Sequence, residues 1–97
     1  MMLLQERTTQ EGLLVSVCDE DILGDSFETS DVTLTVDPEF YDGEAATAEE
    51  VAASLSRAAV ANLVGHDAVG VAVEHGFVEE ANVLEVDGTV HAQYLRM

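Results

Sequence analysis

The chain has one cysteine, Cys18, and its surroundings decide whether it could do chemistry. It ends the apolar run "LLVSVC" at residues 13 to 18, and three acids, Asp19 to Asp21, follow it directly. A nucleophilic cysteine needs a nearby cation or helix N-terminus to stabilise the thiolate, and a histidine base within reach. Adjacent carboxylates would instead raise the pKa of the thiol. We therefore favour a packing role at a strand end, and keep as the alternative a small Cys/His-dependent enzyme or metal-binding protein that uses Cys18 with His66 or His91.

A metal site is the second chemistry to consider. The segment "DEDILGDSFETS", residues 19 to 30, superficially resembles a calcium-binding loop. Leu23 and Ser30 fall at positions 5 and 12 of that loop, where an oxygen ligand and a bidentate glutamate are required. Cys18 and the three histidines have no closed-site spacing such as C-x-x-C. We predict neither a metal nor a cofactor.

Several polar residues are better suited to binding than to catalysis. His91 and Gln93 share one face of an expected strand, because side chains alternate along a strand, and could form a pair that recognises a partner, although a solvated sheet face is the simpler interpretation. Asn62 falls on the inward stripe of an expected helix, where its amide needs hydrogen-bond partners. His66 begins a second helix whose N-terminal amides could hold an anion, although an ordinary helix cap is the simpler interpretation. The candidate binding residues are thus Cys18, Asp19, Asn62, His66, His91 and Gln93.

The strands that must position these residues follow from alternating apolar patterns. Residues 1–7 and 12–18 are expected to form two strands joined across a polar turn. Residues 32–36 alternate cleanly, which predicts a third strand that ends before Pro38 with Val32, Leu34 and Val36 pointing inward. Asp87-Gly88 is a strong hairpin signal, and it predicts strands over residues 82–86 and 89–95.

Two helices are expected between the third and fourth strands. Thr47 and Glu50 have the spacing of a capping box, and helical spacing of apolar residues then continues, so we predict a helix over residues 48–64. Gly65 is placed to be the left-handed residue after its end. A shorter helix is predicted over residues 68–75, with Asp67 as its N-cap and Gly76 as its stop.

The element order β-β-β-α-α-β-β predicts an α+β fold, a two-layer sandwich in which two helices cover one face of a mainly antiparallel sheet. A chain of 97 residues with 47% hydrophobic content predicts a single domain over residues 1–97. No apolar run approaches the ~20 residues needed to span a membrane, and "MMLLQER" is too short for a signal peptide. We expect a cytoplasmic protein.

Charge is the strongest compositional signal. Twenty acidic residues face three arginines and no lysine, which gives a net charge of −17. Such self-repulsion destabilises a compact state in dilute buffer, whereas at 1 M salt the Debye length falls to about 3 Å. The longest acidic run is Asp19 to Asp21, shorter than the blocks typical of acidic interaction tails. We therefore predict adaptation to a salt-accumulating cell.

Several stretches together resemble the small archaeal family known as domain of unknown function 424. They are "VCDEDILGDSF" at 17–27, "FYDGE" at 40–44, "ANLVG" at 61–65, "AVEHGFV" at 72–78, "NVLEVDG" at 82–88 and "HAQ" at 91–93. The resemblance implies an archaeal source and a two-layer α/β domain, and it carries no assigned activity. The lysine-free composition resembles a haloarchaeal version of the family.

Function is predicted from what the motifs exclude. No glycine-rich phosphate loop follows a strand and no lysine could touch a phosphate, which argues against nucleotide hydrolysis. Counter-ion release contributes little at molar salt, so an RNA binder in such a cell need not be basic. We predict a non-catalytic binding module whose macromolecular partner is RNA or a protein of the translation or RNA-processing apparatus. A self-associating structural protein is a third alternative.

Overall fold

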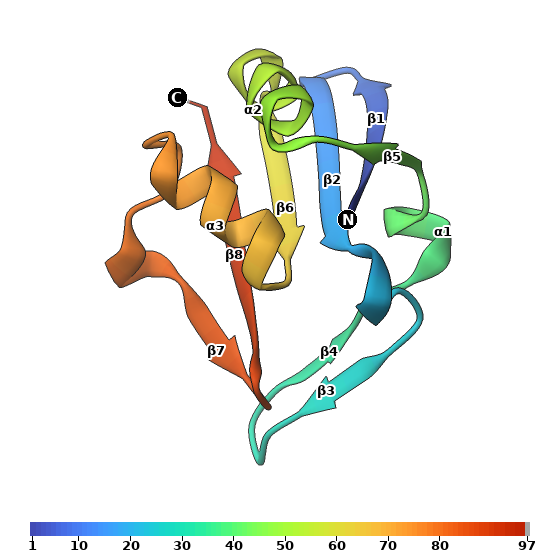
Figure 1. The fold of residues 1–97 in the computed structure, drawn as a ribbon, viewed down its shortest axis with the longest axis vertical. Coiled ribbons are helices and arrows are strands. Elements are labelled where there is room, and N and C mark those ends of the chain that lie inside the picture. The colour runs from blue at the N-terminus through green and yellow to red at the C-terminus, as the bar shows by residue number, and fades with distance from the viewer. Residues whose placement is uncertain (97) are drawn as a thin grey trace.

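A six-stranded sheet of order β5-β1-β2-β6-β8-β7 organises the chain (Figure 1). The computed structural model describes residues 1–96. Neighbouring strands pair antiparallel, except for β2 and β6 at the centre, which run parallel. The predicted α+β class with a mainly antiparallel sheet is confirmed. The strands are β1 (Met2–Thr9), β2 (Gly12–Asp19), β5 (Glu44–Ala46), β6 (Val60–Val64), β7 (Leu84–Val86) and β8 (Thr89–Leu95).

Helices α2 (Ala48–Arg57) and α3 (His66–Glu74) pack on one face of this sheet, which we call the helix face (Figure 1). Alternate strand residues such as Val15 and Leu63 point toward them and meet Leu55 of α2 and Ala72 of α3, and all four are fully buried. Within residues 1–96, no helix combines the length and the apolar character that crossing a membrane requires.

The opposite side of the six-stranded sheet, which we call the back face, is covered at one end only. The cover consists of the short helix α1 (Pro38–Tyr41) and a small second sheet of β3 (Ser26–Glu28) and β4 (Thr33–Thr35). Together with the sheet they bury a separate apolar cluster of Leu3, Cys18, Val36, Tyr41 and Val64. The remainder of the back face has no such cover among the described residues.

The predicted helix over residues 48–64 is wrong in its second half. Its start is confirmed, since Thr47 and Glu50 form the capping box, but α2 ends at Arg57. Ala58 has an extended backbone, with φ −73° and ψ 140°, and residues 60–64 form β6. The segment "VANLV" carries both a helical and an alternating pattern, and two partner strands, β2 and β8, supply backbone hydrogen bonds on either side. Tertiary pairing therefore decides its structure.

The predicted element order is also wrong, because the middle of the chain forms more elements than its pattern shows. The expected strand over residues 32–36 is reduced to Thr33–Thr35 and belongs to the small sheet. Val36 is fully buried, but Val32 is 39% exposed and does not point inward as predicted. The elements β3, α1 and β5 were not predicted, since three or four residues are too few to show a period. The two 3-10 turns are Glu20–Ile22 and Glu80–Asn82.

The hairpin at the end of the described chain follows the prediction closely. Val86 pairs with Thr89 and Leu84 pairs with His91, across the turn made by Asp87-Gly88. Its first strand begins at Leu84, two residues later than predicted, since residues 80–82 form the second 3-10 turn. The register places Leu84, His91 and Gln93 on the back face.

Candidate functional site

Cys18 lies on the back face beneath α1 and is fully buried. Its thiol faces the carbonyl oxygen of Tyr41 at 4.0 Å. Burial, followed by the nearby carboxylates of Asp19, Asp42 and Asp21, raises the pKa of this thiol from 9.0 to about 11. A protonated thiol without access to solvent is a poor nucleophile. The structure therefore gives Cys18 a packing role.

Neither candidate histidine contacts that thiol. Cys18 pairs with Val64 on β6, and Val64 pairs with His91 on β8, so two strand spacings of together about 10 Å separate Cys18 from His91. His66 lies at the start of α3, where its Nε2 is 3.0 Å from the carbonyl oxygen of Gly88. Within the described part of the chain, no group of three or more His, Cys, Asp or Glu side chains is arranged to hold a metal ion.

Asp19 caps the helix α3 from a neighbouring strand. It is 8% exposed, and its two carboxylate oxygens accept hydrogen bonds from the backbone N–H groups of Asp67 (3.1 Å) and Ala68 (2.9 Å). A carboxylate satisfies the free amides at a helix N-terminus and is stabilised by the helix dipole. The prediction of Asp67 as N-cap is therefore wrong, and the chain's own Asp19 occupies the place where an anion was considered.

Gly65 makes this contact sterically feasible. A side chain at this position would place its Cβ 2.6 and 2.7 Å from the two carboxylate oxygens of Asp19, and its backbone has φ +108°, a conformation that favours glycine. The prediction of Gly65 as the left-handed residue that ends a helix is wrong, since it has φ +108° and ψ 155°, follows the strand β6 and immediately precedes α3.

The remaining predicted residues meet on the back face. Asn62 pairs directly with Gln93, and the same register row continues through Ser16 to Gln5, so that four polar side chains cross four adjacent strands. Gln93 is exposed and Asn62 is half-buried. His91 lies on the same face of β8, half-buried, and burial lowers its pKa. Three of the six candidate residues, Asn62, His91 and Gln93, thus share one surface.

Sequence reasoning missed the aliphatic part of that surface. We define the open patch as the back-face side chains that lie outside the cover formed by α1, β3 and β4. Two of its members, Leu84 and Leu95, are 49% and 58% exposed. Alternation along the correctly predicted β8 could have found Leu95, whereas the mistaken helix over residues 48–64 hid Val60. The open patch includes Leu14, Val60, Asn62, Leu84, His91, Gln93 and Leu95.

The back face of the sheet carries no acidic side chain. Four acids occur in its six strands, and all four are directed to the helix face. The register shows this, because each lies opposite a residue that packs in the helix-side core. The pairs are Glu6 with Val15, Asp19 with Met2, Glu44 with Leu4 and Glu85 with Val90. In a chain with 20 acidic residues, this surface is an exception.

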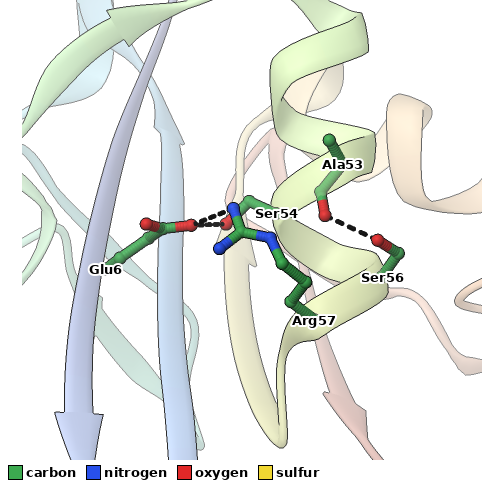
Figure 2. A network of polar contacts seen from close by, with 5 residues as sticks. All are labelled: Glu6, Ala53, Ser54, Ser56 and Arg57. Atoms are coloured by element: carbon green, nitrogen blue, oxygen red, sulfur yellow. Dashed lines mark hydrogen bonds and ion pairs between the residues drawn. The ribbon is translucent and has the colours of Figure 1, made fainter.

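A second polar cluster lies on the helix face and joins β1 to α2 (Figure 2). One carboxylate oxygen of Glu6 accepts hydrogen bonds from the hydroxyl of Ser54 (2.6 Å) and the guanidinium of Arg57 (2.8 Å). Ser54 is fully buried and Arg57 is 61% exposed. The Ser54 hydroxyl has a carboxylate but no imidazole as its partner, so we interpret this cluster as a structural contact.

Comparisons with known proteins identify a similar structure and a matching family. A crystal structure described as an uncharacterized conserved protein from Methanopyrus kandleri is similar to this chain, with a TM-score of 0.79 and 25% sequence identity over 99% of this chain and 94% of that one. No curated protein matches the chain. The family described as "Protein of unknown function (DUF424)" matches residues 6–97. Because this match covers nearly the whole sequence, the chain belongs to the DUF424 family.

Proposed function

We propose that the protein is a non-catalytic binding module and that the open patch is its contact surface. The observation that carries this proposal is the absence of acidic side chains from the back face of a chain whose net charge is −17. Acids on a surface hold water and oppose close contact with another molecule, so a face without them can be desolvated more easily.

The composition of the open patch supports the same proposal. It combines exposed aliphatic side chains with the amides of Asn62 and Gln93, and such a mixture is typical of surfaces that bury apolar area while forming a few directed hydrogen bonds. The partner we propose is a macromolecule, RNA or a protein of the translation or RNA-processing apparatus. The setting we propose is the cytoplasm of a salt-accumulating, haloarchaeal cell, where the remaining acidic surface stays hydrated.

The alternative, an enzyme or metal-binding protein centred on Cys18, has less support. Its thiol is buried beneath α1, and the candidate base His91 lies two strands away. No contact described above favours this alternative over binding.

A pull-down at multi-molar KCl tests the proposal. Tagged wild-type protein is incubated with a lysate of the native cells, with and without ribonuclease, beside two variants of equal charge. Gln93→Glu places an acid in the open patch, and Gln10→Glu places one in the exposed turn between β1 and β2. We expect Gln93→Glu to lose the retained partner and Gln10→Glu to keep it. Retention that is the same for all three proteins would contradict the proposal.

A further inference from the structure

The aliphatic side chains of the open patch flank its amide row on both sides. Leu95 and Leu84 are 58% and 49% exposed, and the half-buried Leu14 and Val60 lie in the register row of Leu95. Stable interfaces bury an apolar centre and leave their polar groups nearer the rim. Here the amides of Asn62 and Gln93 occupy the adjacent row, so the patch offers both apolar area and hydrogen-bonding groups.

Acidic residues lie at both ends of the open patch, and Arg7 of β1 lies opposite Leu14. At one end, Glu11 lines a hollow of about 240 Å³ together with Leu14 and Val60. At the other end, the carboxylate of Asp87 accepts a hydrogen bond from the backbone N–H of Glu28, where the tip of the β3–β4 hairpin meets the β7–β8 turn (Figure 1).

We infer that the open patch binds a protein whose contact surface has an apolar, amide-bearing centre and a border of basic side chains. This inference rests on the function proposed above and specifies its partner. Direct ion pairs at the border set specificity, while the uncharged centre supplies buried apolar area.

An RNA partner fits this surface less well. The arginines and aromatic rings that could bind phosphates and bases lie elsewhere or already contact other groups of the protein. Of the arginines, Arg57 pairs with Glu6, and Arg96 donates to the backbone carbonyls of Ser56 and Ala58. Arg7 lies over the ring of Phe40, 6.0 Å from its centroid. The open patch contains no aromatic side chain on which a base could stack.

The remaining aromatic pairs do not supply such a platform either. Phe77 and Tyr94 stack edge to face at 5.5 Å and pack against the core of the helix face. Phe40 and Tyr41 belong to the cover over the other end of the back face.

A second copy of the chain is also less suitable as the occupant. A symmetric contact places the same patch of both molecules face to face, so the two acidic borders would oppose each other. Direct contact would desolvate carboxylates that have no cationic partner, and this cost remains where salt screens long-range repulsion. A partner with a basic border would remove this cost.

Site-directed photocrosslinking tests the inference. Because Cys18 is fully buried and its pKa is about 11, a cysteine placed on the surface can be labelled selectively without removing it. Leu95→Cys places the label in the open patch, and Ala53→Cys places it on the exposed side of α2. Both variants are labelled with benzophenone maleimide, mixed with native lysate at multi-molar KCl and irradiated, and the cross-linked peptides are identified by mass spectrometry.

The inference is supported if Leu95→Cys, and not Ala53→Cys, cross-links to one protein at a segment with apolar residues flanked by Lys or Arg. The purified partner must then bind the Gln93→Glu variant at least tenfold more weakly than the wild-type chain. Its affinity for the Gln10→Glu variant must stay unchanged. Cross-links to RNA or to the chain itself would overturn the inference and leave the proposed binding role standing. Equal cross-linking from both positions would overturn the binding role as well.

Discussion

At the scale of single residues, Asp19 shows how a carboxylate that could hold a ligand can be used internally. The sequence predicted it as a candidate binding residue after Cys18, yet it caps α3 and is buried. The partner helix begins at residue 66, far away in the sequence, and no local pattern could indicate that contact. The register row of Asn62 and Gln93 was hidden for the same reason, because it depends on which strands pair.

The cap predicts a graded effect on stability. We expect Asp19→Ala to lower the free energy of unfolding by about 1–2 kcal/mol, since the two N–H groups at the start of α3 lose their acceptors. Asp19→Asn should cost less, because its amide oxygen can still accept one bond. Denaturant unfolding at high KCl measures both. Asp21→Ala, which removes an exposed acid two residues away, is the matched control and should change stability by less than about 0.5 kcal/mol.

Gly65 and Gly70 should respond in opposite directions to the same substitution. Gly65→Ala would force a Cβ against Asp19 at a positive φ, and we expect a loss of about 2 kcal/mol or more. Gly70 lies within α3, and a Cβ added there would meet no atom within 4 Å, so Gly70→Ala should raise the free energy of unfolding by up to about 1 kcal/mol. Two losses of similar size would show that the close approach to Asp19 is not what requires Gly65.

The buried thiol should make stability fall at alkaline pH. The pKa of Cys18 is about 11 in the folded protein against 9.0 for an ordinary thiol, so the folded state keeps a proton that the unfolded state releases. The stabilisation is fully present below pH 9 and is lost as the pH rises to about 11, by up to about 3 kcal/mol at about 1.4 kcal/mol per pKa unit. Tyr41, whose pKa burial raises to about 12, adds a further loss above pH 10.

Unfolding curves between pH 8 and pH 11, at constant ionic strength, measure this loss. Cys18→Ala should have a flatter pH profile over the lower part of the range, whatever its absolute stability. Rapid reaction of native wild-type protein with a thiol reagent at pH 8 would show that the Cys18 thiol is accessible to solvent, and would contradict this prediction.

At the scale of elements, the sequence revealed those helices and strands that have clear local signals. The β7–β8 hairpin and the capping box of α2 were predicted correctly, because two-residue turn chemistry and N-cap chemistry are local. The segment at 60–64 was assigned to a helix, because Leu55, Ala58 and Asn62 recur at helical spacing across the true end of α2. What makes it a strand is its place between β2 and β8, and that is a property of the folded sheet.

Ser54 and Arg57 of α2 both contact Glu6 of β1 (Figure 2). Removing each side chain should lower stability with a different dependence on salt concentration. Ser54→Ala removes a buried hydrogen bond to Glu6 and should cost about 1 kcal/mol at any salt concentration. Arg57→Ala removes a largely exposed ion pair, worth at most about 1 kcal/mol, and its effect should disappear at multi-molar KCl. Ser56→Ala, on the exposed side of α2, is the control. Equal salt dependence of the first two variants would contradict this division.

At the scale of the whole molecule, the charge of −17 and the acid-free back face must be considered together. The acids are distributed over the helix face, the loops and the borders of the open patch. Composition alone predicted the total charge, but only the strand register shows that one surface was left without it.

This distribution predicts that stability depends strongly on salt. The free energy of unfolding should rise steadily between dilute buffer and multi-molar KCl at neutral pH, because added ions screen the repulsion among carboxylates. Near the isoelectric point of about 4.1 the same titration should give a much smaller rise. Equal stability in salt-free and concentrated solutions at neutral pH would show that the acidic surface needs another explanation.

The position of β8 inside the sheet, between β6 and β7, has a consequence for synthesis. The edge of β6 that β8 will cover is complete at Val64, but the pairing cannot finish until Leu95 has been added, 31 residues later (95 − 64). At about 5–20 residues per second, a growing chain exposes this apolar strand edge for roughly 2 to 6 s. The many carboxylates already made keep the growing chain hydrated during this interval, and so protect the unfinished sheet from aggregation.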